Sequence, residues 1–410
     1  MIKDREINVE RLRKMIMVSF VTAVFLLVIT YAWFVGMFTV SVNPFEVEIA
    51  ATESLLLSLD GKRWYTEVTI SKDNLDEVCY EGHTNKWGGE KGLKPLSTVG
   101  EVDKTVSRLI FFEKASLTAS PGGYRLLASR VDNFSGEEAD GYVVFDLFIK
   151  NFSGDSYESE LNEDGEEAIY LSLDSSATIA DEGIAETGIE NSVRVAFALI
   201  GRVMGSLKDD AIITSITCHD NKEKGITGIC RDAQIWEPND DKHVSGAINW
   251  YTESCRKRIG HDITKKASFS GPCKPLRDGI SYQTYAVKNK IKVGDNVDIY
   301  DGPVYNGYSH NWAPGKELLY PYPYFTDTMK ELSGIDRPDF LNLAPNSITK
   351  VRVYVYIEGQ DIDNYEFAAY GKKISVNFGF TKQKLTEEDI YYEGPGNPYP
   401  IEDDEEIENP

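Results

Sequence analysis

The sequence predicts a mainly β protein, an antiparallel β-sandwich or jelly roll with insertions, preceded by one N-terminal hydrophobic helix. Apolar and polar side chains alternate with a period of two along many short segments, which is typical of half-buried antiparallel strands. The 410 residues include 23 Tyr and 18 Phe, and aromatic side chains suit pleated strands. Long helical patterns are few, and about ten short strands favour two packed sheets over a helical architecture.

The overall composition is that of a folded, acidic protein. Apolar residues make up 41% and charged residues 27% of the chain, which is more apolar than disordered proteins are. The 43 basic and 66 acidic side chains give a net charge of −23. That charge repels nucleic acid and anionic lipid headgroups, so we expect no nucleic-acid partner.

The N-terminal hydrophobic segment predicts that the protein is exported. An apolar run at 15–29 follows a basic N-terminal flank, which should stay cytoplasmic and send the rest of the chain outside. Two outcomes remain open. Small residues at Thr30 and Ala32 fit a signal peptide cut between Ala32 and Trp33. Alternatively, apolar character continuing through Phe38 reaches the ~20 residues that span a bilayer, so that 1–32 belongs to a retained signal anchor.

We interpret residues 33–385 as the β-rich ectodomain. Four strands alternate most clearly, at 142–150, 193–199, 351–358 and 373–380. The run at 351–358 should bury its valines and expose Arg352 and Glu358. Shorter strand candidates are 45–50, 54–59, 64–70, 107–112, 124–131, 168–173 and 281–287.

The start of this ectodomain carries a hairpin signal. A leucine-rich strand from Leu55 leads to Asp60-Gly61 and then to a second strand from Trp64. An Asp-Gly pair between apolar runs is typical of a tight hairpin turn.

Two segments lack the alternating pattern of the predicted strands, and the C-terminal tail differs from the rest in composition. We interpret 71–104 and 205–292 as insertions. The tail at 386–410 holds ten acidic side chains and no basic one, so we expect it to be disordered.

Enzyme motifs are missing from the sequence. No His is followed by Glu, which excludes the HExxH zinc-protease helix, and there is no GxSxG elbow, phosphate loop or dinucleotide fingerprint. We therefore expect no enzyme and no cofactor. Glycoside hydrolysis by carboxylates from distant strands is the alternative that a single sequence leaves open.

Three acidic clusters carry oxygen ligands of the kind that calcium prefers: 237–241, Asp295 with Asp298 and Asp301, and 358–364. In the last, Asp361, Asp363 and Asn364 follow a predicted strand and form the calcium candidate. The alternative is a solvated turn in which Asp and Asn bond their own backbone. His243 follows the first cluster and is more simply a surface histidine than a metal ligand.

Five cysteines are present, with no CxxC pair, so neither a zinc ribbon nor a thioredoxin motif is indicated. An exported location permits disulfides. Candidate pairs inside the 205–292 segment are Cys218 with Cys230 and Cys255 with Cys273, although spacing does not fix connectivity. Cys79 would then be left over, either buried or paired elsewhere.

The residues Thr30 to Phe34, the strand around 40–49 and the hairpin at 54–64 resemble exported Gram-positive surface proteins of the TasA and camelysin type. Segments such as 191–199, 235–243 and 357–364 look like those of uncharacterised clostridial surface proteins with the same N-terminal pattern. The resemblance implies a dedicated signal peptidase and a jelly-roll subunit that assembles into extracellular fibres by passing its N-terminal strand to a neighbour. The assembly strand would lie within 34–50, with the apolar positions Phe38, Val40, Val42, Phe45, Val47 and Ile49. Their alternation shifts phase at Asn43-Pro44.

Two functions follow as hypotheses. The first is an exported cell-surface structural protein, a fibre or matrix subunit that self-associates, with contact to the membrane through its N-terminal helix. The alternative is a membrane-anchored, adhesin-like module that binds a glycan or protein ligand. Its binding platforms would be the aromatic residues Trp236, Trp250, Tyr251 and Trp312.

Overall fold

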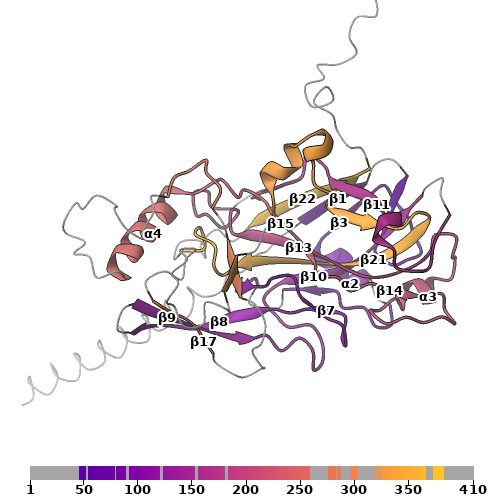
Figure 1. The fold of residues 1–410 in the computed structure, drawn as a ribbon, viewed down its shortest axis with the longest axis horizontal. Helices are drawn as coiled ribbons and strands as arrows, with labels where there is room; N and C mark the ends of the chain where they lie inside the picture. Colours follow the sequence, from indigo (N-terminus) through magenta and orange to yellow (C-terminus); the bar gives the residue numbers. More distant parts are fainter. Residues whose placement is uncertain are drawn as a thin grey trace, which may run out of the picture.

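The computed structural model describes residues 46–51, 54–78, 80–88, 92–120, 123–152, 156–180, 183–258, 276–282, 284–287, 297–302, 319–321, 324–365 and 373–382. Over these residues the chain is mainly β, as predicted, with antiparallel and mixed sheets (Figure 1). The predicted signal segment 1–32, most of the assembly strand and the acidic tail lie outside the described residues. Among the described residues, no helix has the length and apolarity to cross a membrane.

A twelve-stranded sheet, called here the main sheet, is built around β21 (Ser347–Glu358). β21 pairs antiparallel with β10 (Val143–Asn151) on one side and with β13 (Val193–Met204) on the other. These are three of the four strands that alternate most clearly in the sequence. The other members are β2 (Leu55–Ser58), β4 (Lys86–Trp87), β5 (Pro95–Ser97), β8 (Phe112–Ser120), β9 (Gly123–Arg130), β14 (Thr227–Gly228), β15 (Gln234–Glu237), β17 (Val297–Gly302) and β19 (Phe325–Thr326).

A six-stranded sheet, called here the second sheet, contains the first and last described strands. Its order is β20-β11-β22-β1-β3, and β12 also pairs with β22. In Figure 1 its strands β22, β1, β3 and β11 lie above β13, β21 and β10 of the main sheet. The bounds are β1 (Glu46–Ala51), β3 (Glu67–Ile70), β11 (Glu167–Leu171), β12 (Ser176–Ile179), β20 (Leu341–Leu343) and β22 (Ile374–Thr381).

The remaining elements are short. The strand pairs β6 (Val102–Asp103) with β7 (Arg108–Leu109) and β16 (Tyr285–Val287) with β18 (Leu319–Pro321) form two-stranded sheets. The helices are α2 (Lys72–Glu77), α3 (Asp210–Thr214) and α4 (Ser245–Arg258), with 3₁₀ turns η1 (Glu163–Gly165), η2 (Asp327–Glu331) and η3 (Gly334–Asp336). The segments interpreted as insertions contain α2, α3 and α4, but also β4, β5, β14 and β15 of the main sheet.

One apolar core holds side chains from both large sheets. The alternating apolar residues of β10, β13, β21 and β22 are all in it. Because successive side chains of a strand point to opposite faces, a period-2 pattern places one face of each sheet in this core. Its members from these four strands are Val143, Phe145, Leu147, Ile149, Val193, Val195, Phe197, Leu199, Val351, Val353, Val355, Ile357, Ile374, Val376, Phe378 and Phe380.

The prediction that Arg352 and Glu358 are exposed is wrong, because the other face of the main sheet is covered as well. A second apolar cluster, including Phe148, Tyr354 and Tyr356, lies on that face. Arg352 is buried there and its Nε donates to Asp146 Oδ1 over 2.7 Å. A charged residue at an alternate strand position is therefore not exposed to solvent in this sheet.

The turn of the predicted hairpin connects two strands that belong to different sheets. Asp60 accepts hydrogen bonds from the N–H groups of Lys62 and Arg63, and Gly61 adopts φ +71°, which favours glycine. The flanking strands, however, pair with each other only at the Leu57–Tyr65 bridge. β2 continues into the main sheet and β3 into the second sheet, so this turn joins the two layers.

Candidate functional site

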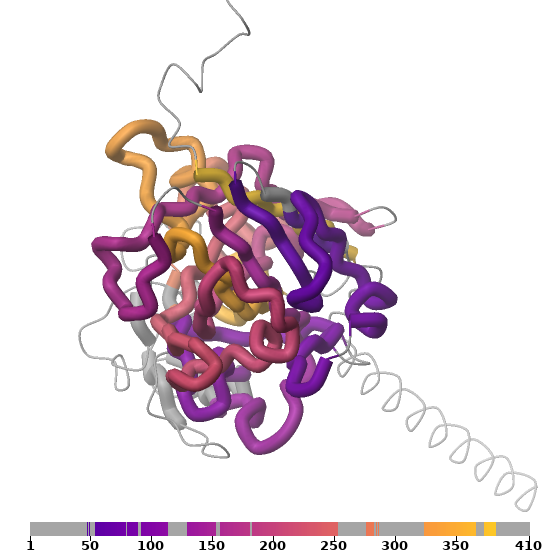
Figure 2. The backbone as a smooth tube through the Cα atoms, turned by 90° about the vertical axis from the view of Figure 1, so that its right-hand side faces the viewer, coloured from indigo at the N-terminus to yellow at the C-terminus, as the bar shows by residue number. Residues whose placement is uncertain are grey.

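The first described strand occupies the interior of the second sheet. β1 pairs in parallel with β22 from Glu46–Ser375 to Ala51–Phe380, and antiparallel with β3 on its other edge. In Figure 1 the labels of β1, β22 and β3 lie next to one another, and Figure 2 shows the indigo part that follows β1 near the yellow last strand. Val47 and Ile49 are both fully buried in the shared core. Of the predicted assembly positions, these two are described with side chains; Phe38, Val40, Val42 and Phe45 lie outside the described residues.

The link between β1 and β2 is short and carries an unusual backbone. Only residues 52–54 separate the two strands, although β1 belongs to the second sheet and β2 to the main sheet. Ser54 adopts φ +67°, a left-handed conformation that is uncommon for a residue with a Cβ atom. Such a conformation stores of the order of 1 kcal/mol of backbone strain. Backbone strain therefore lies at Ser54, directly before β2.

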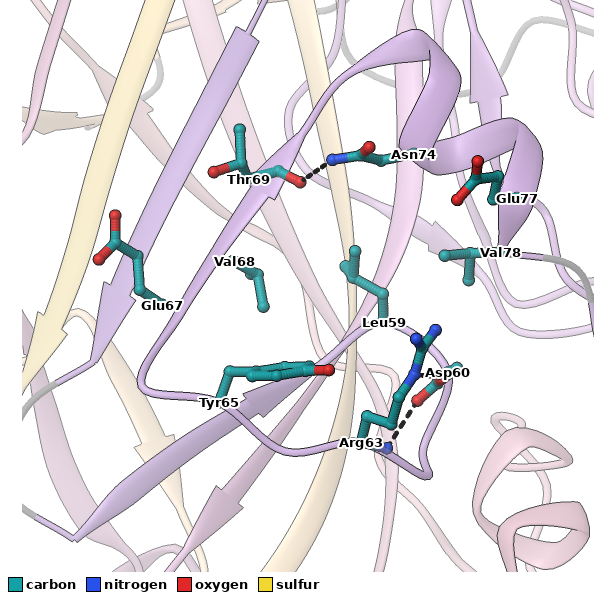
Figure 3. A pocket seen from close by; sticks show the side chains of 10 residues that line it. All are labelled: Leu59, Asp60, Arg63, Tyr65, Glu67, Val68, Thr69, Asn74, Glu77 and Val78. Carbon is teal, nitrogen blue, oxygen red and sulfur yellow. Dashed lines mark hydrogen bonds and ion pairs between the residues drawn. The ribbon is translucent and has the colours of Figure 1, made fainter.

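A hollow of about 370 Å³ lies along β3 and α2, in the part of the chain where the two sheets are joined (Figure 3). In the order of the second sheet, β3 has β1 on one side and ends the sheet on the other. Ser71 caps the start of helix α2, because its Oγ accepts the N–H of Asn74. Asn74 Nδ2 donates to the carbonyl oxygen of Thr69 over 2.9 Å. Asn74 thus fixes the helix against the strand and forms one wall of the hollow.

The hollow combines an exposed aromatic ring with fixed charges. Tyr65 is 48% exposed and points toward Arg63 and Leu59 (Figure 3). Arg63 Nε donates to Asp60 Oδ2 over 2.9 Å. Burial raises the pKa of Asp60, but hydrogen bonds from the Arg63 and Lys62 N–H groups and the Arg63 guanidinium outweigh it and hold that pKa below its ordinary value. The arrangement suits a small polar ligand with one apolar face.

The calcium candidates Asp361 and Asp363 contact the side chains of Arg194 and His243 in the structure. Arg194 is fully buried and donates to both Asp361 and Glu237. His243 Nδ1 lies 2.6 Å from Asp363 Oδ2, and the N–H of Val244 donates to Asp363 Oδ1 over 3.0 Å. Asn364 donates its N–H to the carbonyl oxygen of Asp361. Within the described residues no group of three His, Cys, Asp or Glu side chains is arranged to hold a metal, and calcium binding stays a prediction.

His243 is a buried partner of Asp363 and not the surface histidine that the sequence suggested. Its Nε2 lies 3.0 Å from the carbonyl oxygen of Ile280, which only accepts hydrogen bonds, so Nε2 carries a proton. Its Nδ1 faces the Asp363 carboxylate. Burial lowers the pKa of His243, but the hydrogen bond and charge of Asp363 more than offset this and raise it above the ordinary value. The two ring nitrogens thus face the Asp363 carboxyl group on one side and the Ile280 carbonyl oxygen on the other.

Two buried glutamates in the same region have strongly raised pKa values. Burial raises the pKa of Glu237 to about 7, against the opposing charge of Arg194. Burial likewise raises the pKa of Glu358 to about 8, although the Gln360 N–H donates to its Oε1 over 2.9 Å. These groups join the ends of β13, β15 and β21 to the loop that follows β21. They form a network of buried ionisable groups, called here the Arg194 network.

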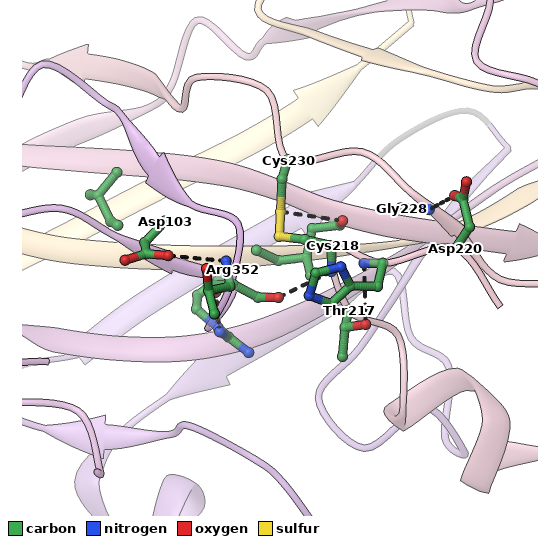
Figure 4. The surroundings of a disulfide bond; sticks show 12 residues. Asp103, Thr217, Cys218, Asp220, Gly228, Cys230 and Arg352 are labelled. Atoms are coloured by element: carbon green, nitrogen blue, oxygen red, sulfur yellow. Dashed lines mark hydrogen bonds between the residues drawn. A yellow bond between two sulfur atoms is a disulfide. The ribbon is translucent and has the colours of Figure 1, made fainter. Parts of the chain in front are cut away.

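The Cys218–Cys230 pair forms a disulfide, with the two Cα atoms 5.3 Å apart (Figure 4). It closes the loop that carries β14, and the Gly228 N–H also donates to Asp220 in that loop. The side chain of Cys255, and Cys79 and Cys273 entirely, lie outside what the structure describes.

The predicted aromatic platforms are not available for binding at two positions. Trp236 is fully buried and its Nε1 donates to Asp327 Oδ1, and Tyr251 is 4% exposed. Trp250 is partly buried against the shared core, and Trp312 lies outside the described residues. Trp236 lies in the shared core, and Tyr251 belongs to α4, whose Ala247 is also in that core. Tyr65, which the sequence did not single out, is the exposed ring that lines a hollow.

No protein-family model, curated protein or solved structure matches the chain.

Proposed function

We propose that this protein is an exported cell-surface structural protein, a fibre or matrix subunit that self-associates by exchanging its N-terminal strand. The observation that carries the proposal is the seat of β1, which lies between β22 and β3 with Val47 and Ile49 in the core. Removing β1 would leave two strands with unpaired edges and an open apolar slot. The identical strand of a second copy has the side chains and backbone groups to fill that slot.

The geometry of the hinge supports exchange. A short, strained connection between two strands favours domain swapping, because the strain is released when the strand swings out to a neighbour. The link between β1 and β2 is three residues long, and its last residue, Ser54, has a left-handed backbone. Each subunit gives its β1 to one neighbour and receives β1 from another, so the contact is head-to-tail and propagates into a filament.

We also propose that the two large sheets constitute a β-sandwich of the jelly-roll type. The apolar core shared by the two sheets supports a sandwich. It contains the side chains on one face of β10, β13 and β21 and the facing side chains of β1 and β22. The additional cover on the other face of the main sheet would be an elaboration of that architecture.

Export is part of the same proposal. The basic flank and apolar run at 1–32 support passage through the membrane, with either cleavage by a signal peptidase after Ala32 or retention as an anchor. N-terminal sequencing of the protein recovered from its native cell surface distinguishes these outcomes. A start at Trp33 means cleavage, Met1 in the membrane fraction means an anchor, and recovery from the cytosol alone contradicts export.

Electron microscopy of purified protein tests assembly. Protein beginning at Trp33 should form filaments, and protein beginning at Leu55, which lacks β1, should not. A synthetic peptide of residues 45–51 added to the second protein should occupy the empty slot and restore its thermal stability without restoring filaments. Filaments formed equally by both proteins would contradict strand exchange.

A second function, the binding of a glycan or protein ligand, is favoured by the hollow beside β3. Its exposed Tyr65 ring and polar walls suit a sugar ring, which stacks on an aromatic face and hydrogen-bonds at its edge. Tyr65→Ala should abolish binding of soluble cell-wall glycan fragments, and Phe152→Ala, at an exposed ring elsewhere, should not. Equal binding by both variants would remove this function from the hollow.

A further inference from the structure

Three side chains at the ends of three strands meet away from the sites described above. Asn151 is the last residue of β10 in the main sheet, Glu167 begins β11, and Lys382 directly follows β22 in the second sheet. Asn151 Nδ2 donates to Glu167 Oε2 over 2.7 Å, and Lys382 Nζ lies 3.0 Å from the same oxygen. An amine, a carboxylate and a carboxamide are thus joined through one oxygen atom.

The lysine is held beside the asparagine by the backbone as well. Lys382 Nζ donates to the carbonyl oxygen of Phe152, the residue after Asn151, over 2.6 Å. This bond and the carboxylate contact restrict the amine to the neighbourhood of the Asn151 side chain. Lys382 and Glu167 are largely shielded, with side chains 19% and 30% exposed.

The Asn151 carboxamide is fully buried and fixed in orientation. Its Nδ2 faces two acceptors, Glu167 Oε2 and, over 3.0 Å, the carbonyl oxygen of Ala344. Exchanging Oδ1 and Nδ2 would place acceptors against acceptors, so the nitrogen points to the carboxylate. The amide oxygen is buried and accepts no hydrogen bond in the described part of the chain. A buried amide with an unpaired oxygen lowers the stability of the fold. Its presence therefore suggests a role other than stabilisation.

We propose that Lys382 and Asn151 form an intramolecular isopeptide bond, with Glu167 as the catalytic proton carrier. The Glu167 carboxylate takes a proton from the Lys382 ammonium, and the free amine attacks Cγ of Asn151. The new Nζ–Cγ bond forms as the Cγ–Nδ2 bond breaks. Glu167 passes its proton to Nδ2, which leaves as ammonia, and takes the remaining surplus proton from Nζ. The reaction requires no oxidant, metal or cofactor.

The position of the bond gives it a mechanical consequence. It ties the end of β22 to the end of β10, and therefore the second sheet to the main sheet. β22 is the strand on which β1 is seated. Should β1 come from a neighbouring subunit, force along the filament would pass from β22 into the main sheet through a covalent link. The bond itself does not depend on assembly, so it is tested separately.

Mass spectrometry of the full-chain protein tests the proposal. The wild type should be lighter than its sequence mass by about 17 Da, the mass of the ammonia that leaves. A tryptic digest should contain residues 151–194 joined to residues 374–384, because trypsin does not cut at an acylated lysine. A full wild-type mass, with a free peptide ending at Lys382, would overturn the proposal without need of any variant.

Two variants identify the roles of the residues. Lys382→Arg keeps the positive charge but removes the amine nucleophile, and Glu167→Gln keeps a hydrogen-bonding group but removes the proton carrier. Both should regain the full mass, and Lys382→Arg should melt roughly 5–10 °C below the wild type because the long cross-linked loop is opened. A mass loss that persists in Lys382→Arg would place the reaction elsewhere and contradict this assignment.

Discussion

Val47 near the start of β1 lies opposite Val376 of β22, and both side chains are completely buried. The two strands run parallel, and almost the whole described chain lies between them. Parallel partners cannot be joined by a tight turn, so nothing local in the sequence forces β1 into this seat. In the proposed exchange, the β1 of a neighbouring copy would take this place between β22 and β3.

Shortening the side chain of Ile49 should destabilise the fold strongly. Ile49→Ala removes buried methyl groups from the shared core and should lower the free energy of unfolding by about 2–5 kcal/mol. Urea unfolding followed by circular dichroism measures it. The control is Glu67→Ala on the exposed face of neighbouring β3, which should change stability by less than about 0.5 kcal/mol. Equal effects would mean that β1 is not seated in the core.

Stability should fall between about pH 5 and pH 8 through the Arg194 network. Glu237 and Glu358 have ordinary pKa values of 4.5 that rise to about 7 and about 8 in the folded protein. In this interval the folded state binds more protons than the unfolded state, so stability is fully present below pH 4.5 and is lost as pH rises. The raised pKa of His243 acts in the same direction.

Melting temperatures recorded from pH 5 to pH 8.5 test this pH dependence. The wild type should melt lower at pH 8.5, and Glu358→Gln should flatten the curve because the amide does not ionise. Glu77→Gln, on an exposed face of α2, should leave the slope unchanged. A wild-type curve that rises toward pH 8.5, or an unchanged slope in Glu358→Gln, would show that the glutamate is ionised in the folded state.

Removing Arg352 should leave an uncompensated charge in the protein interior. Asp146 is fully buried between Arg352 and Lys350 and accepts a hydrogen bond from Tyr80. Burial raises the pKa of Asp146, but the two cations more than offset it and hold it well below the ordinary value. Arg352→Met should cost about 3–5 kcal/mol, and adding Asp146→Asn should recover part of that loss. Lys62→Met, at a surface ion pair, should have no measurable effect. If the double variant were less stable than Arg352→Met, the assigned pairing would be wrong.

Removing the Cys218–Cys230 disulfide should lower the stability of the protein moderately. The cross-link spans 12 residues, so replacing both cysteines with alanine should lower stability by about 2–3 kcal/mol. Reductant should lower the melting temperature of the wild type but not that of the double variant. A shift of similar size in both proteins would indicate another disulfide as the main contributor.

The sequence predicted the strands with the clearest alternation because burial of one strand face leaves a period-2 signal. β10, β13, β21 and β22 all lie close to their expected positions. It did not predict what covers the opposite face, since the cover comes from distant segments such as those carrying Phe111 and Ile216. Arg352 and Glu358 were for that reason expected in solvent and are buried.

Long-range pairings account for the other differences. The Asp60-Gly61 turn is visible in the sequence, but the destination of its two strands in different sheets is not. Asp361 and Asp363 look like cation ligands because their partners Arg194 and His243 come from other parts of the chain. The Asn151–Glu167–Lys382 contact joins residues up to 231 positions apart, counting from 151 to 382, and has no motif. Charge at a strand end gives no hint of its partner.

A disulfide between β1 and β3 tests strand exchange most directly. Glu48 and Thr69 are direct partners across these antiparallel strands, at a separation that suits a disulfide, so Glu48→Cys with Thr69→Cys should form one. If filaments are built by exchange, the bond joins neighbouring subunits, and oxidised filaments should give a ladder of multimers on a denaturing, non-reducing gel that collapses with reductant. Thr69→Cys alone should give no ladder beyond a dimer. Filaments whose oxidised double variant runs only as monomer would show that each β1 stays in its own subunit, and would contradict the account.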